Sequence, residues 1–373
     1  MAKITFTGDI MCSPRMTELA KGDFSPVFSR AKKLADCDYL VGNLETPIAG
    51  EALRYTFDRY CFNSPAAYLT ALKEAGFDLF SLANNHCMDR GEAGIINTLA
   101  ACRDAGFDTV GLNATEADRN RIFVKELDGI RIAFLSYTYG TNAFYHKRFM
   151  EHPYMVNLIQ PEETLPGSIH LLWDYGKIGE YVKRIYLEKG EEYPIVVPYL
   201  ERLEADIKRA KRVADYVIVL MHNGGQNITE IDPYSAYIAE RVREFGADLI
   251  VGNHQHVIQP CGRDGDTPRI YCLGNLIYDQ RIAGKDWFVD NPVYSAVYHL
   301  DISRGENGKI NTKHSFSIYM TVTDKNGLPA LMDTYDVCKT LDEAYIRSEP
   351  VRYANLFAGG ARTYTEVQEV YEL

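Results

Sequence analysis

The chain has 373 residues, of which 46% are hydrophobic and 24% are charged, as is ordinary for a folded globular protein. Its formal net charge is −11, so it has no surplus of basic residues to neutralise phosphates, and we exclude nucleic acid as the expected main partner. The 8 cysteines form no Cys-x-x-Cys pair, which argues against a zinc ribbon and suits a reducing compartment.

The N-terminal part of the sequence alternates short apolar runs with amphipathic stretches. Lys3–Thr7 has the alternation of a β-strand and ends at Gly8-Asp9, and Ser13-Pro14 then has the pattern of a helix start. Because the chain enters a strand at once and has no apolar run of membrane length, we expect no leader peptide, no membrane anchor and a cytoplasmic location. Further strands are expected at 36–45, 77–86 and 107–113, and helices at 64–76 and 94–105.

The rest of the chain begins with a hairpin. Phe123–Leu127 and Ile130–Ser136 flank an Asp128-Gly129 turn. Residues 140–197 are rich in aromatic residues and prolines, and we interpret them as an insertion, either a lid over a substrate or a packing appendage. We expect helices at 199–214 and 233–245 and strands at 215–222, 248–253 and 269–275. Residues 1–282 are predicted to form one domain, and residues 283–373 a β-rich C-terminal extension packed on it.

One pattern recurs along the chain: a helix ends, an aspartate follows, a short apolar strand comes next, and polar residues stand at its tip. It begins at Asp38, Asp78, Asp108, Asp215 and Asp248. Strands that alternate with helices in this way indicate parallel βα units, and ligands bind beyond the carboxyl ends of such strands. We therefore predict an α/β fold that gathers the strand tips at one edge: Asp9, Asn43, Glu45, Asn84, Asn85, His86, His222, His254 and His256.

These tips offer carboxylates, amides and imidazoles but no thiolate. Such a set suits Mn, Zn, Fe or Mg, and we expect one or two divalent metal ions per chain. His254 and His256 lie on alternate residues past a strand end, so we expect them to point to opposite sides and to serve different ions. Two ions bridged by a carboxylate can activate a water and stabilise displacement at phosphorus, and a nearby histidine can protonate the leaving group.

Five ordered blocks resemble the calcineurin-like metallophosphoesterase superfamily and, within it, the poly-γ-glutamate capsule-synthesis (CapA) family. The blocks are Gly8-Asp9-x-Met11, Gly42-Asn-Leu-Glu45, Asn84-Asn-His86, His222-Asn-Gly224 and Gly252-Asn-His-Gln-His256. The narrower family's marks are Asn43-Leu-Glu-Thr-Pro47, Ala83-Asn-Asn-His-x-x-Asp89-x-Gly91, Gly246-Ala-Asp-Leu-Ile-Val-Gly252 and Tyr271-x-Leu-Gly-Asn275. The resemblance covers about residues 3–280.

The resemblance implies a four-layer α/β/β/α sandwich and a role for each strand tip. Asp9 and His256 would hold a first ion, Glu45 or alternatively Asn43 would bridge, and Asn85, His222 and His254 would hold a second ion. In the same comparison His86 would be the general acid, Asp89 would orient it, and Arg15 would clamp an anionic group. No role is assigned to the remaining histidines: His146, His152, His170, His299 and His314.

The sequence departs from the family pattern at several of these positions. Met11 replaces a histidine of the first site, Asn43 replaces the bridging aspartate, and Asn253 replaces the first of two adjacent histidines. His222-Asn-Gly-Gly-Gln-Asn227 lacks a carboxylate and two aromatic residues. We predict a metal-dependent hydrolase, with a phosphoesterase as the leading hypothesis. The alternatives are an amide or γ-glutamyl hydrolase and a non-catalytic capsule-assembly factor. We expect an anionic substrate, small or polymeric, and the sequence predicts no oligomeric state.

Overall fold

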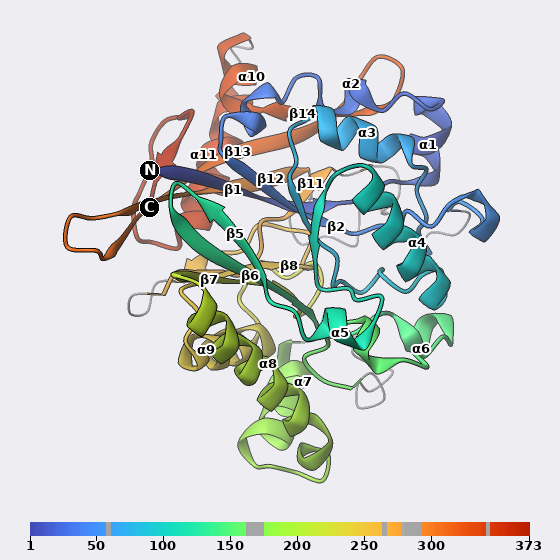
Figure 1. Cartoon of the computed structure of the whole chain (residues 1–373). Helices are drawn as coiled ribbons and strands as arrows, with labels where there is room; N and C mark the ends of the chain where they lie inside the picture. The colour runs from blue at the N-terminus through green and yellow to red at the C-terminus, as the bar shows by residue number, and fades with distance from the viewer. Residues whose placement is uncertain (57–60, 162–174, 263–266, 278, 280–292, 341–343) are drawn as a thin grey trace.

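The protein has two β-sheets that lie face to face, with helices on the outer side of each (Figure 1). The structure is a computed structural model that describes all residues except 57–60, 162–174, 263–266, 278, 280–292 and 341–343. The larger sheet has the order β14-β13-β12-β1-β2-β3-β4, with β11 beside β1 and β15 beside β13. Its strands are β1 (Ala2–Ile10), β2 (Tyr39–Leu44), β3 (Leu79–Ser81), β4 (Asp108–Val110), β11 (Asn275–Ile277), β12 (Tyr294–Arg304), β13 (Ile310–Thr323), β14 (Pro329–Asp333) and β15 (Tyr371–Glu372).

The smaller sheet has the order β5-β6-β7-β8-β10-β9. Its strands are β5 (Phe123–Leu127), β6 (Ile130–Thr138), β7 (Tyr216–His222), β8 (Leu249–Asn253), β9 (Cys261–Gly262) and β10 (Arg269–Ile270). The antiparallel pair β5–β6 confirms the hairpin predicted around Asp128-Gly129. The pairs β1–β2 and β2–β3 of the larger sheet and β6–β7 and β7–β8 of the smaller sheet are parallel, as the repeated pattern indicated.

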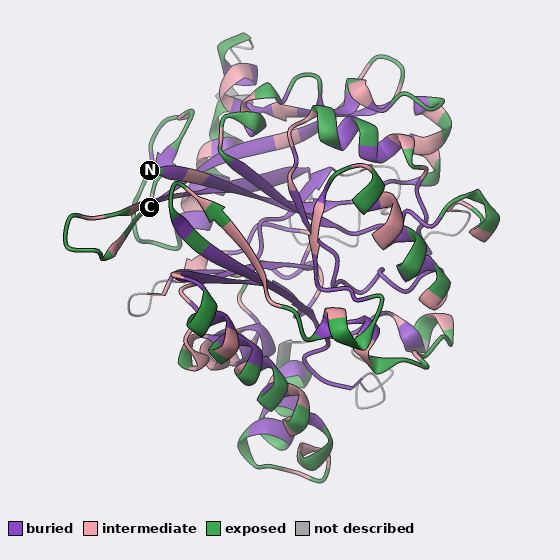
Figure 2. Ribbon diagram, in the orientation of Figure 1, coloured by how far each residue is buried: buried purple, intermediate pink, exposed green. Residues whose placement is uncertain are grey.

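Three groups of buried apolar side chains define the layers. One fills the space between the sheets, where Phe6 and Val41 meet Phe134, Leu220 and Val251. A second lies under the helices of the larger sheet, and a third under those of the smaller sheet. Figure 2 shows the strands of both sheets buried, while the exposed residues lie mainly on helices and loops. This arrangement is a mixed α/β sandwich.

Helices cover the outer faces of both sheets. The larger sheet carries α1 (Pro14–Ala20), α2 (Ser25–Phe28), α3 (Ala67–Glu74) and α4 (Gly91–Asp104), and the smaller carries α7 (Tyr175–Val182), α8 (Tyr193–Val213) and α9 (Pro233–Phe245). The other helical elements are α5 (Glu116–Arg119), α6 (Ala143–His146), α10 (Thr334–Thr340), α11 (Ala344–Ala358), three 3₁₀ turns (Lys32–Ala35, Glu51–Leu53, Pro153–Met155) and a π-turn (Lys183–Leu187). Among the described residues, none of the helices combines the length and the apolar character that crossing a bilayer requires.

The prediction of one continuous strand at 269–275 is wrong, because this segment forms parts of two strands in different sheets. The chain forms β10 in the smaller sheet, leaves it, and then forms β11 beside β1 in the larger sheet. Gly274 lies between the two strands with φ +79, and a Cβ there would lie 2.9 Å from the Tyr294 carbonyl oxygen. The segment that looks like one strand therefore ties the two sheets together.

The predicted start of a helix at Tyr199 is also wrong, because α8 begins at Tyr193. Pro194 occupies the first turn, where the backbone N–H groups have no partner in the helix and a proline costs little. Pro198 lies inside the helix. The interpretation of 140–197 as a lid stays a prediction, and residues 162–174 of it, His170 included, lie outside the described part.

The C-terminal part contributes strands to the larger sheet. Ala2 to Phe6 of β1 pair with Ile302 to Tyr298 of β12 in an antiparallel ladder, and β13 and β14 continue outward. Residues 283–292 and 341–343 lie outside the described part. The division of the chain at residue 282 stays a prediction.

Candidate metal centre

The carboxyl ends of the parallel strands meet at one edge of the sandwich. Asp9 of β1 stands in register with Asn43 of β2 and with Asn275 of β11, and His222 of β7 stands in register with Asn253 of β8. The glycine before Asp9 is required, because a Cβ at Gly8 would lie 2.0 Å from the Gly274 carbonyl oxygen. Strand pairing thus fixes the backbone positions of the site before any side chain is considered.

Asp9 is completely buried, and both of its oxygens are engaged. Asn43 Nδ2 donates to Asp9 Oδ1 at 2.7 Å, and His256 Nδ1 lies 3.1 Å from Asp9 Oδ2. The same Asn43 nitrogen lies 3.2 Å from His222 Nδ1. The amide nitrogen of Asn43 therefore faces both Asp9 and His222 and holds these two neighbours together, and its role as the alternative bridging ligand stays a prediction.

Glu45 is completely buried, yet neither of its oxygens accepts a hydrogen bond from any residue that the structure describes. His222 Nε2 lies 3.5 Å from Glu45 Oε1 and His256 Nε2 lies 3.9 Å from it, without the geometry of a hydrogen bond. A buried carboxylate without donors is costly unless a cation neutralises it. This orphaned carboxylate, surrounded by imidazoles, fits a divalent metal ion.

Two groups of ligand-type atoms surround this carboxylate. One consists of Asp9, Glu45 and His256, and the other of Glu45, His222 and His254; within each, the ligand atoms lie within 4.8 Å of one another. Glu45 belongs to both of these groups, which were found among the described residues. The structure thus brings the predicted Asp9, Glu45, His222, His254 and His256 together, and their roles as metal ligands stay predictions.

The second group has a further neighbour in Asn85. Asn85 Oδ1 lies 2.7 Å and His254 Nδ1 lies 3.1 Å from His222 Nε2, so three potential ligand atoms converge. The nitrogen of the Asn85 amide faces Asn142 Oδ1 at 3.4 Å. This contact orients the Asn85 oxygen toward the two histidines.

His254 and His256 belong to different groups, but not for the reason expected from strand alternation. β8 ends at Asn253, and the backbone then turns through φ +114 at His254 and φ +61 at His256. Positive φ values are unusual for residues with a Cβ and accumulate at functional sites. The tight turn, and not an extended backbone, separates the two imidazoles, whose ring centres lie 6.0 Å apart.

A hydrogen bond sets the tautomer of His256. Its Nδ1 lies 3.0 Å from Asn275 Oδ1 and 3.1 Å from Asp9 Oδ2, while Asn275 Nδ2 donates to the His256 carbonyl oxygen. Both neighbours of Nδ1 are acceptors, so Nδ1 keeps its proton in the neutral ring, and Nε2, which faces Glu45, is the nitrogen that gains and loses the second proton. Asn275 was not assigned a role from the sequence, although it ends one of the family motifs.

Electrostatic interactions within the site shift the pKa values of its groups in different directions. Burial opposes the charged form of Glu45, but the imidazoles of His256, His222 and His86 lower its pKa to about 2. Burial and the charge of Glu45 raise the pKa of Asp9. Burial favours neutral His256, but the carboxylates of Glu45 and Asp9 outweigh it and raise the pKa of His256 to about 9. The metal-free site therefore holds a proton that a cation would displace.

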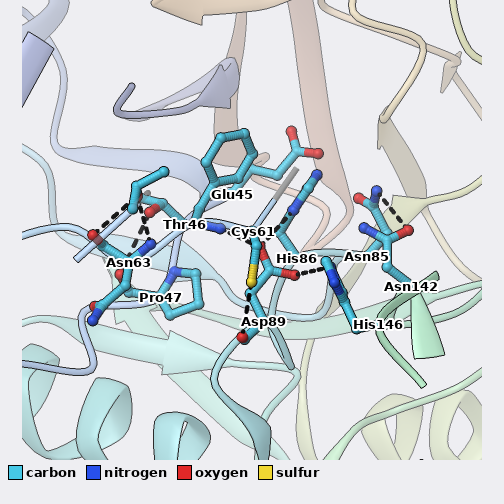
Figure 3. Close-up of polar contacts among 12 residues, drawn as sticks. Glu45, Thr46, Pro47, Cys61, Asn63, Asn85, His86, Asp89, Asn142 and His146 are labelled. Atoms are coloured by element: carbon cyan, nitrogen blue, oxygen red, sulfur yellow. Dashed lines mark hydrogen bonds and ion pairs between the residues drawn. The ribbon is translucent and has the colours of Figure 1, made fainter. Parts of the chain in front are cut away.

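His86 and Asp89 form a pair next to this site. His86 Nδ1 lies 2.8 Å from Asp89 Oδ2, and the ring extends from Asp89 toward the carboxylate of Glu45 (Figure 3). Burial lowers the pKa of His86, but Asp89 and then Glu45 raise it above its usual value. These two carboxylates therefore favour the protonated form of His86, the form that a proton donor at the edge of the site requires.

Three contacts around Asp89 carried no signal in the sequence. His146 Nε2 lies 3.1 Å from Asp89 Oδ1, and Cys61 Sγ lies 3.3 Å from the Asp89 carbonyl oxygen. Phe62 packs on the His86 ring with the ring centres 4.4 Å apart. His146, Cys61 and Phe62 lie outside the strand tips, so the repeated sequence pattern did not identify them.

Two further predicted positions lie apart from the cluster. Arg15 is partly buried on α1; the described structure gives it no contact with the ligand-type residues, and its Nε has no hydrogen-bond partner there. Met11 packs against the apolar layer between the sheets, and its carbonyl oxygen accepts from the Tyr68 hydroxyl at 3.1 Å. The prediction that Arg15 clamps an anion stays open, and Met11 supplies no imidazole.

The fold and the site define an α/β sandwich protein with carboxylates and imidazoles gathered at the carboxyl ends of its parallel strands. The model of the family "Bacterial capsule synthesis protein PGA_cap" matches residues 3–280, and the chain belongs to this family. The resemblance to the capsule-synthesis family inferred from the sequence blocks is confirmed.

Curated relatives carry names from the same family. The chain is 28% identical over 282 residues to the capsule biosynthesis protein CapA of Bacillus anthracis and 25% identical over 286 residues to the PGA biosynthesis protein CapA of Bacillus subtilis strain 168. Each alignment covers 74% of this chain but only 60% and 63% of the relatives, so the chain spans less than two thirds of their length. A crystal structure of a hypothetical protein from Thermus thermophilus aligns over 88% of this chain and 97% of its own at 18% identity, but its TM-score of 0.40 supports no further comparison.

Proposed function

We propose that this protein is a metal-dependent phosphoesterase with a metallophosphoesterase-type fold. The observation that carries the proposal is the buried carboxylate of Glu45, which accepts no hydrogen bond from the described residues and is shared by two groups of imidazoles and carboxylates. A buried charge of this kind is retained where a cation completes it. The two-sheet sandwich, with the site at its strand ends, supports the fold assignment.

Each ligand-type residue has a place in this proposal. Asp9 and His256 would hold one ion, His222, His254 and Asn85 would hold the other, and Glu45 would serve both. Oxygen and imidazole donors suit Mn, Zn, Fe or Mg. When bound, such ions supply Lewis acidity and lower the pKa of a water molecule toward neutrality.

The chain itself supplies the proton for the leaving group. His86 borders the site, its Nδ1 is held by Asp89 at 2.8 Å, and its pKa is raised above the usual value by the carboxylates of Asp89 and Glu45. A protonated imidazole fixed in this way donates through Nε2. Asp89 keeps the ring in that orientation.

A second candidate is a metal-dependent amide or γ-glutamyl hydrolase. The names of two relatives, a capsule biosynthesis protein and a PGA biosynthesis protein, favour it, because such a polymer is joined by amide bonds and is anionic. The same residues would serve, since a cation polarises a carbonyl as it does a phosphoryl oxygen. The third hypothesis is a non-catalytic capsule-assembly factor. It is motivated by Met11, which replaces a histidine of the first metal site.

Metal analysis with parallel substrate screens tests these readings. We expect purified protein to retain one or two divalent transition ions and to hydrolyse an aryl phosphodiester, with both properties lost in His222→Ala. His152→Ala is the control, because His152 is an exposed histidine that pairs with Glu92 outside the cluster. Cleavage of γ-glutamyl peptides with inert phosphoesters would favour the amidase. A protein that binds no metal under several supplements would overturn both enzyme readings.

A further inference from the structure

The loop Asn85–Asp89 carries a proposed ligand and the proposed acid, and one nearby segment contacts it at three points. We infer that residues 142–148, here called the clamp segment, position this loop, and that His146 is the positioning residue that fixes His86 through Asp89. The inference deepens the proposed function and rests on it only for the role of His86 in turnover. The clamp segment includes α6 and belongs to the region interpreted as an insertion.

The carboxylate of Asp89 is the centre of the arrangement. Asp89 is completely buried; its Oδ2 accepts from the Phe62 backbone N–H at 2.6 Å and faces His86 Nδ1 at 2.8 Å. Its other oxygen, Oδ1, lies 3.1 Å from His146 Nε2, and the His146 side chain is only 8% exposed. Figure 3 shows His86 and His146 on the two sides of this carboxylate. His146 Nε2 and Asp89 Oδ1 lie within ion-pair distance without the geometry of a hydrogen bond. Contacts on both sides restrict rotation of the carboxylate and favour one orientation of His86.

The other two contacts of the clamp segment act on the same loop. Asn142 Oδ1 accepts from Asn85 Nδ2 at 3.4 Å, which turns the Asn85 oxygen toward His222. Arg148 donates to the backbone carbonyl oxygen of Asp89. The clamp segment therefore contacts the side-chain amide of Asn85, the carboxylate of Asp89 and the backbone carbonyl of Asp89. It positions both the proposed ligand and the residue that orients the proposed acid.

A third metal site is the competing interpretation of the same atoms. Cys61 Sγ, an Asp89 oxygen and a His146 nitrogen lie within 4.8 Å of one another. Two guanidinium groups argue against a cation here: Arg90 donates to Cys61 Sγ at 2.7 Å, and Arg148 donates to the Asp89 carbonyl. Their positive charge disfavours a further cation beside Cys61 and the backbone of Asp89. Asp89 Oδ1 and His146 Nε2 make no hydrogen bond within the described residues, so a zinc-binding measurement decides between the two interpretations.

NMR of the imidazole N–H groups tests the clamp without requiring turnover. We expect wild-type protein to show a downfield Nδ1–H resonance, assigned to His86 by its absence in His86→Ala. That resonance should shift or broaden in His146→Ala and return in His146→Gln, because the glutamine amide can donate to Asp89 Oδ1. The control His152→Ala, in the same stretch of chain but exposed, should leave it unchanged. An unperturbed His86 resonance in a folded His146→Ala would overturn the inference.

Two further measurements separate this inference from its rivals. In an active protein, His146→Ala should slow turnover of an aryl phosphodiester with a poor leaving group about tenfold more than one with a good leaving group, at unchanged metal content and KM. Equal losses on both esters would reduce His146 to a structural role. Stoichiometric zinc binding that is lost in Cys61→Ser would establish the competing metal site. If wild type hydrolyses nothing, the proposed function fails, while the NMR result still decides the clamp.

Discussion

Two residues, Glu45 and His256, give the candidate site its response to pH. Glu45 stays ionised in the folded protein, and its charge, with that of Asp9, raises the pKa of His256 to about 9 from an ordinary value of 6.5. Below 6.5 both the folded and the unfolded chain hold this proton. Between 6.5 and about 9 only the folded chain holds it, so folding takes up a proton and loses stability as the pH rises.

The affinity for metal should change in the opposite direction over the same range. Metal ions compete with the proton on His256, so we expect the Kd for Mn²⁺ or Zn²⁺ to fall by roughly tenfold per pH unit and to level off above about pH 9. Titration calorimetry and urea unfolding of the metal-free protein measure the two effects. His256→Gln should flatten both profiles, and a wild-type affinity that is independent of pH would contradict the protonated state.

The sequence could indicate residues at strand tips but not the residues that approach them from elsewhere. Asp9, Glu45, His222 and His254 each follow an apolar strand, and parallel pairing alone brings strand ends together. Asn275 meets His256 only because the chain crosses between sheets just before it, and neither the crossing nor the turn at Gly274 has a periodic pattern. His146 and Asn142 lie in an irregular segment whose path depends on tertiary packing.

At the scale of elements, a buried ion pair connects α5 to α8. Arg119 Nη1 donates to Asp206 Oδ2 at 2.7 Å, the Tyr137 hydroxyl donates to the same oxygen, and Arg119 and Asp206 have side chains only 7% and 5% exposed. Arg209 also contacts Asp206. Removal of Arg119 leaves Asp206 with Arg209, whose side chain is 33% exposed, as its charged partner, so the buried carboxylate becomes only partly compensated, which is more costly than the loss of the pair itself.

We therefore expect Arg119→Met to lower the free energy of unfolding by about 3 kcal/mol. The double variant Arg119→Met/Asp206→Leu should recover most of this loss, because no charge remains at the two buried positions and Arg209, the other partner of Asp206, has a side chain that is 33% exposed. Urea unfolding gives the values. The matched control is Lys208→Met on the same helix, whose partner Glu204 forms an exposed pair; its effect should stay within about 0.5 kcal/mol. Equal effects at Arg119 and Lys208 would show that burial of the pair contributes nothing.

At the scale of the whole molecule, the family match ends at residue 280 but the larger sheet does not. β12 pairs along five positions of β1, which carries Asp9, and its apolar side chains complete the layer between the sheets. A chain that ended at residue 282 would turn β1 into a sheet edge and expose apolar surface.

We expect this truncated chain to be insoluble or partly unfolded and to bind no metal. Circular dichroism, limited proteolysis and metal analysis of the truncated and full chains measure this. A truncated chain that folds cooperatively and retains metal would show that residues 283–373 form a separable unit. That outcome would contradict the proposal that the C-terminal part packs on the same domain.

The division of the ligand-type residues between the two sheets has a mechanical consequence. Asp9 and Glu45 lie on or directly after strands of the larger sheet, whereas His222, His254 and His256 lie on or directly after strands of the smaller one. The distances across the site are therefore set by how the two sheets pack, and a sub-ångström shear at that apolar interface changes every one of them together. We therefore expect substitutions among the side chains between the sheets, far from any ligand-type residue, to change these distances and with them the affinity for metal.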